Sequence, residues 1–127
     1  MKKETLQPPS LKALQSFLKY DEVNGGFVYT RKRRGSPVKP GDIAGVPQPN
    51  GMMTIMVESK RHYIHRLVWY WHHGSLPDYP YMVAHRDGDV YNNRIDNLEV
   101  VHFNDHRAKR MMLRDAEMKY QYSEYVS

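Results

Sequence analysis

The chain has 127 residues, the length of one compact domain or of a domain with an appended arm. Its 19 Lys and Arg against 14 Asp and Glu give a formal charge of +5, and the calculated isoelectric point is about 9.4. This excess predicts a polyanionic partner, with nucleic acid as the first candidate. The chain contains no cysteine, which excludes disulfides, zinc ribbons and thiol nucleophiles.

The start of the chain is basic but is not followed by an apolar segment, and no later window reaches membrane-spanning length. We therefore expect a cytoplasmic protein with no membrane partner.

The first half predicts a helix followed by short strands. Ser10 can cap an amphipathic helix over residues 11–18, and Asn24-Gly25-Gly26 is a turn signal before a strand at Phe27–Thr30. Residues 35–51 are rich in Gly and Pro and predict a loop, with room for a short strand near Ile43.

The next segment predicts a hairpin and a helix. Strands at 53–57 and 61–64 flank a turn, and a helical pattern then runs from His65 to His73 and stops at Gly74. We expect the strands at Phe27 and Met53 to share one small antiparallel sheet.

The last third predicts a strand, a polar loop, a second strand and a helix. The strands are Tyr81–His85 and Leu98–Val101, and Asn104 can cap the final helix. The fold class expected for the whole chain is α+β, with a small antiparallel sheet, helices and a C-terminal ββα element.

Three polar residues of this ββα element have a spacing that suits phosphodiester hydrolysis. His85 ends a strand, Asn97 follows twelve positions later, and His106 follows nine after that. A histidine at a strand end can take a proton from water, while a metal held on the same element can stabilise charge on a phosphate.

The text "VAHRDGDVYNNRIDNLEVV" followed by "NDH" closely resembles the HNH endonucleases, in particular the small phage and intron-associated homing enzymes. The resemblance extends from about Leu11 to Arg110. It implies metal-dependent hydrolysis of DNA with Mg²⁺ or Mn²⁺, with His85 as general base, Asn97 bracing the loop that orients this base, and His106 as a metal ligand.

The chain departs from the family pattern at Ala84. The resemblance implies Asp or His there as a second metal ligand, and a methyl group cannot coordinate a cation. We therefore expect impaired cleavage. Because the rest of the motif is intact, a recent or engineered change is favoured over an old one, although the sequence leaves its origin open.

The basic residues have both a structural and a DNA-binding interpretation. The run Arg31, Lys32, Arg33, Arg34 is either a solvated charge run or a phosphate-contacting segment. Arg94 either clamps a phosphate or pairs with a carboxylate such as Asp96, and we favour the clamp. The last helix carries two more candidates for DNA contact, Arg107 and Arg110. His62 and His65, at a strand-to-helix junction, are interpreted as structural.

We expect residues 1–75 to be a DNA-contacting lead-in packed on the HNH element of residues 76–127. The hypothesis for the chain as written is an HNH endonuclease weakened by Ala84. The alternative is a non-catalytic DNA-binding regulator or decoy derived from such a nuclease, and RNA binding ranks third. Target site, strand specificity and oligomeric state, monomer or dimer, stay open.

Overall fold

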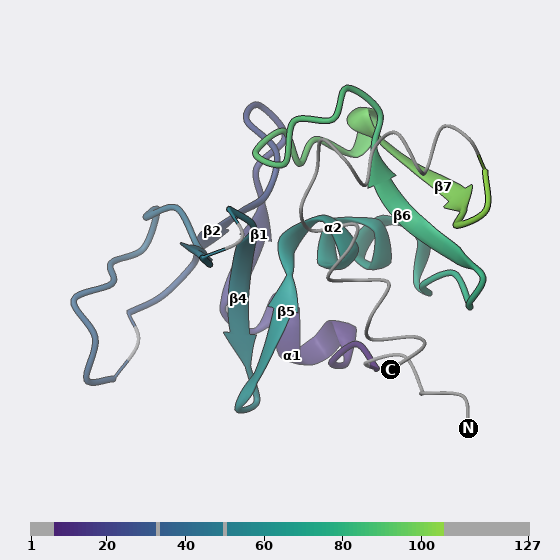
Figure 1. Ribbon diagram of the computed structural model, residues 1–127. Helices are drawn as coiled ribbons and strands as arrows, with labels where there is room; N and C mark the ends of the chain where they lie inside the picture. The colour runs from purple at the N-terminus through teal and green to yellow at the C-terminus, as the bar shows by residue number, and fades with distance from the viewer. Residues whose placement is uncertain (1–6, 33, 50, 106–127) are drawn as a thin grey trace.

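The computed structural model describes residues 7–32, 34–49 and 51–105. These residues form an α+β fold built from three small antiparallel sheets, two α-helices and a 3₁₀-helix (Figure 1). The fold class predicted from the sequence is confirmed. The final helix predicted after Asn104 falls outside the described residues.

The first helix is shorter than predicted. Helix α1 spans Leu11–Gln15 and begins as expected at Ser10, whose Oγ accepts a hydrogen bond from the Ala13 N–H at 3.1 Å. The prediction that the helix continues to residue 18 is wrong, because Leu18–Tyr20 forms strand β1. Its burial alternates between buried, exposed and buried, which is the period of a strand, and the apolar spacing of the preceding residues fits either structure.

The prediction of one shared sheet is also wrong. Strand β2, Phe27–Tyr29, pairs with β1, whereas β4, Met53–Val57, pairs with β3, Val46–Pro47, and with β5, Lys60–Tyr63. A bridge between Val28 and Ile43 ties the long loop to β2. Each strand pairs with residues three to eleven positions away in sequence, and such local partners are the commonest in antiparallel sheets.

Helix α2, Ile64–His73, lies at the centre of the molecule. It ends at Gly74 in the left-handed conformation, as the sequence predicts, and packs against β4, β5, β6 and η1. Its buried residues pack in an apolar core that also contains side chains of β1, β2, β4, β6 and β7. Within the described ranges, no helix is long and apolar enough to cross a membrane.

The C-terminal sheet pairs β6, Tyr81–His85, with β7, Leu98–His102. Both strands were predicted, and the connection between them contains the 3₁₀-helix η1, Ile95–Asn97. Strand β6 lies beside α2, and the connection passes over the top of the molecule in Figure 1. The end of β6 is thereby placed between α2 and this connection.

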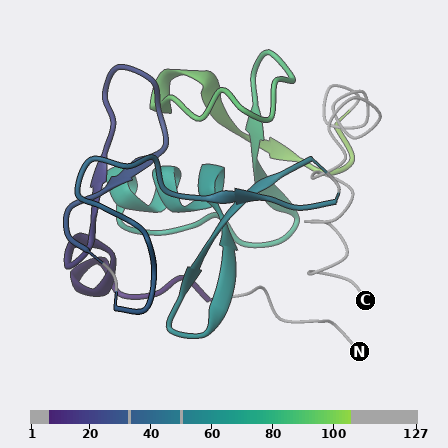
Figure 2. The ribbon, with the colours of Figure 1, turned by 90° about the vertical axis from the view of Figure 1, so that its left-hand side faces the viewer.

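The turn between β1 and β2 is docked on the connection between β6 and β7. The Gly26 N–H donates to the Asn93 carbonyl at 3.3 Å, and Arg94 Nη1 donates to the Val23 carbonyl at 3.1 Å. The Tyr20 hydroxyl accepts from the Ile95 N–H at 2.9 Å. Figures 1 and 2 show the two segments side by side at the top of the molecule. The N-terminal part of the chain therefore supports the loop that follows His85.

Gly25 makes this docking possible. Its φ is +79°, and a Cβ built on it would lie 2.4 Å from the Arg94 backbone nitrogen, well inside van der Waals contact. Gly35 has a similar φ of +73° but an open surrounding, with nothing within 4 Å of such a Cβ. Alanine at Gly35 therefore measures the cost in stability of the left-handed backbone alone. Alanine at Gly25 adds the cost of the overlap with Arg94.

We predict that Gly25→Ala lowers the free energy of unfolding by more than Gly35→Ala does. Gly35→Ala should cost about 1–2 kcal/mol for the left-handed conformation, and Gly25→Ala should cost about 1–3 kcal/mol more for the backbone overlap. Urea unfolding of both variants measures the difference. Equal losses would contradict the close docking of the turn.

His62 provides a pH-dependent contribution to stability. Its side chain on β5 is 6% exposed, and burial, assisted by the charges of Arg66 and Lys60, lowers its pKa to about 4. In the unfolded chain, His62 has an ordinary histidine pKa near 6.5 and binds a proton below that pH. In the folded chain, His62 stays neutral down to about pH 4. Protonation therefore favours unfolding, so this contribution is complete above pH 6.5 and is lost as the pH falls towards 4.

We predict that the melting temperature of the chain falls more steeply between pH 7 and pH 4.5 than that of His62→Gln. Glutamine fills a similar volume without titrating, so its profile shows the contribution of the remaining groups. Thermal unfolding followed by circular dichroism across this range measures both profiles. Parallel profiles would show that His62 is not buried in its neutral form.

Candidate active site

His85, the predicted general base, is the last residue of β6 and is only 1% exposed. Its Nε2 lies 2.8 Å from the side-chain oxygen Oδ1 of Asn93, which is itself buried. A buried polar pair of this kind is costly to break, since leaving one partner unsatisfied costs about 1–3 kcal/mol. His85 is thus held in one orientation at the strand end.

The ring of His85 also contacts His65. The two ring centroids are 4.8 Å apart, and His65, in the first turn of α2, is 1% exposed. From the sequence, His65 is interpreted as structural, and the fold places it directly against the predicted base. Its position follows from the packing of α2 on β6.

Asn97 braces the loop after His85. Its side-chain Nδ2 donates to Asp87 Oδ1 and to the Asn92 carbonyl, both at 2.9 Å, and its own carbonyl accepts from the Arg86 N–H at 2.7 Å. These contacts join the two ends of the β6–β7 connection next to the base.

Asp87 is the centre of this loop network. Burial acts to raise the pKa of its carboxyl group, but hydrogen bonds from Asn92, the Asp89 N–H and Asn97, together with the charge of His85, outweigh burial and hold the pKa below its ordinary value. The carboxylate therefore stays ionised as an acceptor. It closes the loop through these hydrogen bonds.

Ala84, at the predicted metal-ligand position, is 0% exposed and lies opposite Glu99 in the register of β6 and β7. Paired residues in an antiparallel sheet project from the same face, so Glu99 is the nearest carboxylate across the strand. It lies 3.4 Å from Arg86 in an ion pair. In the described part of the chain, no group of three or more His, Cys, Asp or Glu side chains is arranged to hold a metal ion. The described donor set therefore does not by itself fit a metal.

The predicted DNA-binding residues lie in two places. Arg31, Lys32 and Arg34 are exposed in the segment after β2, at the start of the loop that projects to the left in Figure 1. Arg94 is exposed, donates to Val23 and has its Nε 3.6 Å from Asp96. Four predicted site residues fall outside the described ranges: Arg33, His106, Arg107 and Arg110.

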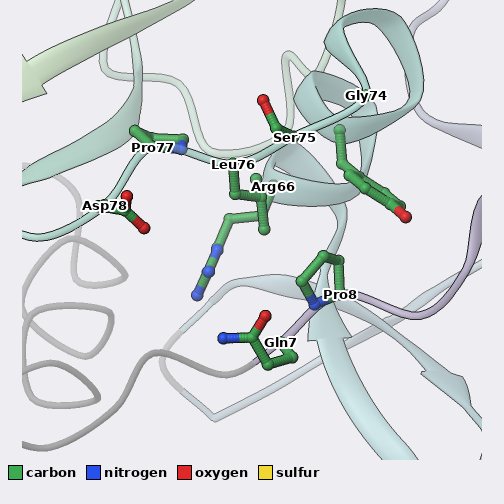
Figure 3. A pocket seen from close by; sticks show the side chains of 9 residues that line it. Gln7, Pro8, Arg66, Gly74, Ser75, Leu76, Pro77 and Asp78 are labelled. Atoms are coloured by element: carbon green, nitrogen blue, oxygen red, sulfur yellow. The ribbon is translucent and has the colours of Figure 1, made fainter.

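A cavity of about 350 Å³ lies apart from these residues, between the start of the described chain and the end of α2. It is lined in part by Gln7, Ser75 and Asp78, and the Arg66 guanidinium points into it (Figure 3). None of the predicted site residues lines this cavity.

Sequence reasoning missed the contacts of Asn93 and His65 with the base. Asn93 stands in a loop of eight polar or small residues where spacing distinguishes no single asparagine, and its role is visible once its side chain is placed on His85. His65 appears in sequence as one of two histidines at a strand-to-helix junction. A sequence signal for either would need their distance to His85, which only the fold supplies.

Residues 62–108 match the family model for the HNH endonuclease. The match runs from β5 through α2 and both strands of the C-terminal sheet, and so includes His65, His85, Asn93 and Asn97. Comparison with curated proteins and with solved structures gave no match. This segment, which contains the geometry described above, is therefore similar to the HNH endonuclease family.

Proposed function

We propose that this chain is a DNA endonuclease whose general base is His85 and whose cleavage is weakened by Ala84. The observation that supports this function best is the buried His85 at the end of β6, oriented by Asn93 beneath a loop braced by Asn97, within the segment that matches the family. A general base acts from a defined orientation, and the hydrogen bond to Asn93 supplies one for His85.

In the proposed reaction His85 takes a proton from a water molecule. The water oxygen then forms a bond to the phosphorus of a DNA phosphodiester, and the bond from phosphorus to the 3′ oxygen breaks. The 3′ oxygen leaves and acquires a proton from solvent. The products carry 5′ phosphate and 3′ hydroxyl ends.

The weakening follows from the chemistry of the residues on β6. A divalent ion, Mg²⁺ or Mn²⁺, is the cofactor that the family implies, and it would stabilise charge on the phosphate. Ala84 offers no donor atom, and the side chain opposite it, Glu99, is already ion-paired with Arg86. His106, the other ligand by resemblance, lies outside the described residues.

We propose double-stranded DNA as the partner, contacted through its phosphates by the exposed basic segment at Arg31, Lys32 and Arg34. Exposed Arg and Lys side chains neutralise phosphates without reading sequence. Arg94 can add a contact because its head group is exposed beside the loop after His85. In this proposal residues 1–75 act as the DNA-contacting lead-in to the element of residues 76–127.

The alternative function is a DNA-binding regulator or decoy. The fully buried methyl group of Ala84 favours it, because a chain that binds DNA without cleaving it has no need of a ligand at this position. The two functions share the DNA surface and differ in what repair of position 84 achieves.

We predict that Ala84→Asp and Ala84→His raise metal-dependent plasmid cleavage by at least ten-fold over the chain as written, because each restores a donor atom. Ala84→Asn serves as the uncharged match for Asp. Agarose gels of supercoiled plasmid incubated with Mg²⁺ or Mn²⁺ measure nicking and linearisation.

The double variant Ala84→Asp, His85→Ala is the control. It should lose the gained cleavage while still binding DNA, since general-base catalysis contributes about 10²–10⁴ in rate. DNA binding without cleavage by any repaired variant would support the regulator or decoy instead.

Ala84→Asp should also make stability depend on metal. The new carboxylate lies opposite Glu99, and like charges directly opposite in a sheet destabilise it. We predict that its melting temperature is below that of Ala84→Asn without metal and rises on addition of Mn²⁺. A melting temperature that does not respond to Mn²⁺ would argue against a metal site at this position.

We predict that Lys32→Ala, Arg34→Ala weakens binding to unrelated DNA duplexes equally and reduces the salt dependence of binding. Each lost phosphate contact should lower the slope of log K against log salt by about 0.9. Lys12→Ala, Lys19→Ala, which changes net charge equally at exposed positions of α1 and β1, is the matched control. Fluorescence anisotropy at several salt concentrations measures both. Equal effects of the two double variants would place the DNA contact elsewhere.

A further inference from the structure

The contact between His85 and Asn93 defines which nitrogen of the histidine can act as a base. The Nε2 of His85 lies 2.8 Å from Oδ1 of Asn93, and an amide oxygen can only accept a hydrogen bond. With the Asn93 amide oriented in this way, Nε2 donates the hydrogen bond and carries the proton of the neutral ring. The other nitrogen, Nδ1, then carries the lone pair.

Asn93 is itself fixed by the backbone around it. Its carbonyl accepts from the Gly26 N–H at 3.3 Å, and the next residue, Arg94, accepts from the Asn97 N–H at 2.9 Å and donates to Val23. Its side chain is buried, with 4% of the residue exposed. The turn between β1 and β2 thus positions Asn93, and Asn93 in turn orients His85.

The two asparagines have separate sets of contacts. Asn97 donates to Asp87 and Asn92 and so closes the loop, whereas Asn93 contacts the imidazole. The neighbouring Asn92 uses its side-chain nitrogen on Asp87. Loop bracing and control of the imidazole therefore belong to different residues.

We propose that Asn93 is a positioning residue that fixes His85 in the tautomer protonated at Nε2, so that Nδ1 accepts the proton of the attacking water. The inference rests on the proposed function for its catalytic meaning, while the tautomer itself is independent of any activity. The docked turn at Gly25 and Gly26 contributes to this positioning, because it anchors the backbone of Asn93.

The experiment is nitrogen NMR of the full chain labelled with ¹⁵N, in which long-range proton correlations distinguish the two ring nitrogens of each neutral histidine. Loss of one set of signals in His85→Gln assigns His85. The result expected for the unaltered chain is a protonated Nε2 and an unprotonated Nδ1. A His85 ring protonated at Nδ1 would overturn the proposal without any substitution of Asn93.

Three variants extend the test. Asn93→Ala should give a mixture of tautomers, and Asn93→Asp should keep Nε2 protonated because a carboxylate also accepts. Asn92→Ala, which alters the same loop through Asp87, should leave the His85 signals unchanged in type. An Asn93→Ala spectrum with the same single tautomer would overturn the positioning role.

Cleavage separates this inference from the proposed function. In the Ala84→Asp background, Asn93→Ala should lower kcat by about ten- to a hundred-fold with little change in KM, within the range that a positioned base contributes, and Asn93→Asp should recover most of it. If the tautomer is as proposed but His85→Ala leaves cleavage unchanged, the proposed function fails and the assignment of the tautomer stands.

Discussion

The hydrogen bond between His85 and Asn93 is the constraint on which the arrangement of the site depends. It links the end of β6 to the loop that follows, and this loop is held by the turn between β1 and β2 from the other half of the chain. A buried imidazole next to a second histidine would otherwise have several orientations available. The N-terminal hairpin and the HNH segment therefore form one structural unit around the base.

Ala84 lies on the same strand as His85 but projects from the opposite face. The residue before the base points from the other face of β6, where Ala84 is completely covered and has Glu99 as its cross-strand partner. In the proposed function, the contacts that orient His85 are present, while position 84 offers no donor atom to a metal. Repair of this one residue therefore tests the proposed loss of cleavage.

The sequence predicted the elements whose signals are local. Short apolar segments indicated β6 and β7, and Gly74 indicated the end of α2. Leu14 and Leu18 fit a helix and a strand equally, so β1 was missed. His85 and Asn97 were predicted as site residues from the motif. The contacts of Asn93 and His65 with His85 join segments separated in sequence, and no local pattern encodes them.

In the proposed function, the repaired chain hydrolyses DNA through His85. The most direct measurement is resealing by DNA ligase of plasmid nicked by Ala84→Asp, beside the same reaction with Ala84→Asp, His85→Ala. We predict nicks that ligase closes, since their ends carry 5′ phosphate and 3′ hydroxyl groups, and no nicks from the chain without His85. Nicks that resist ligase, or equal nicking without His85, would contradict the account.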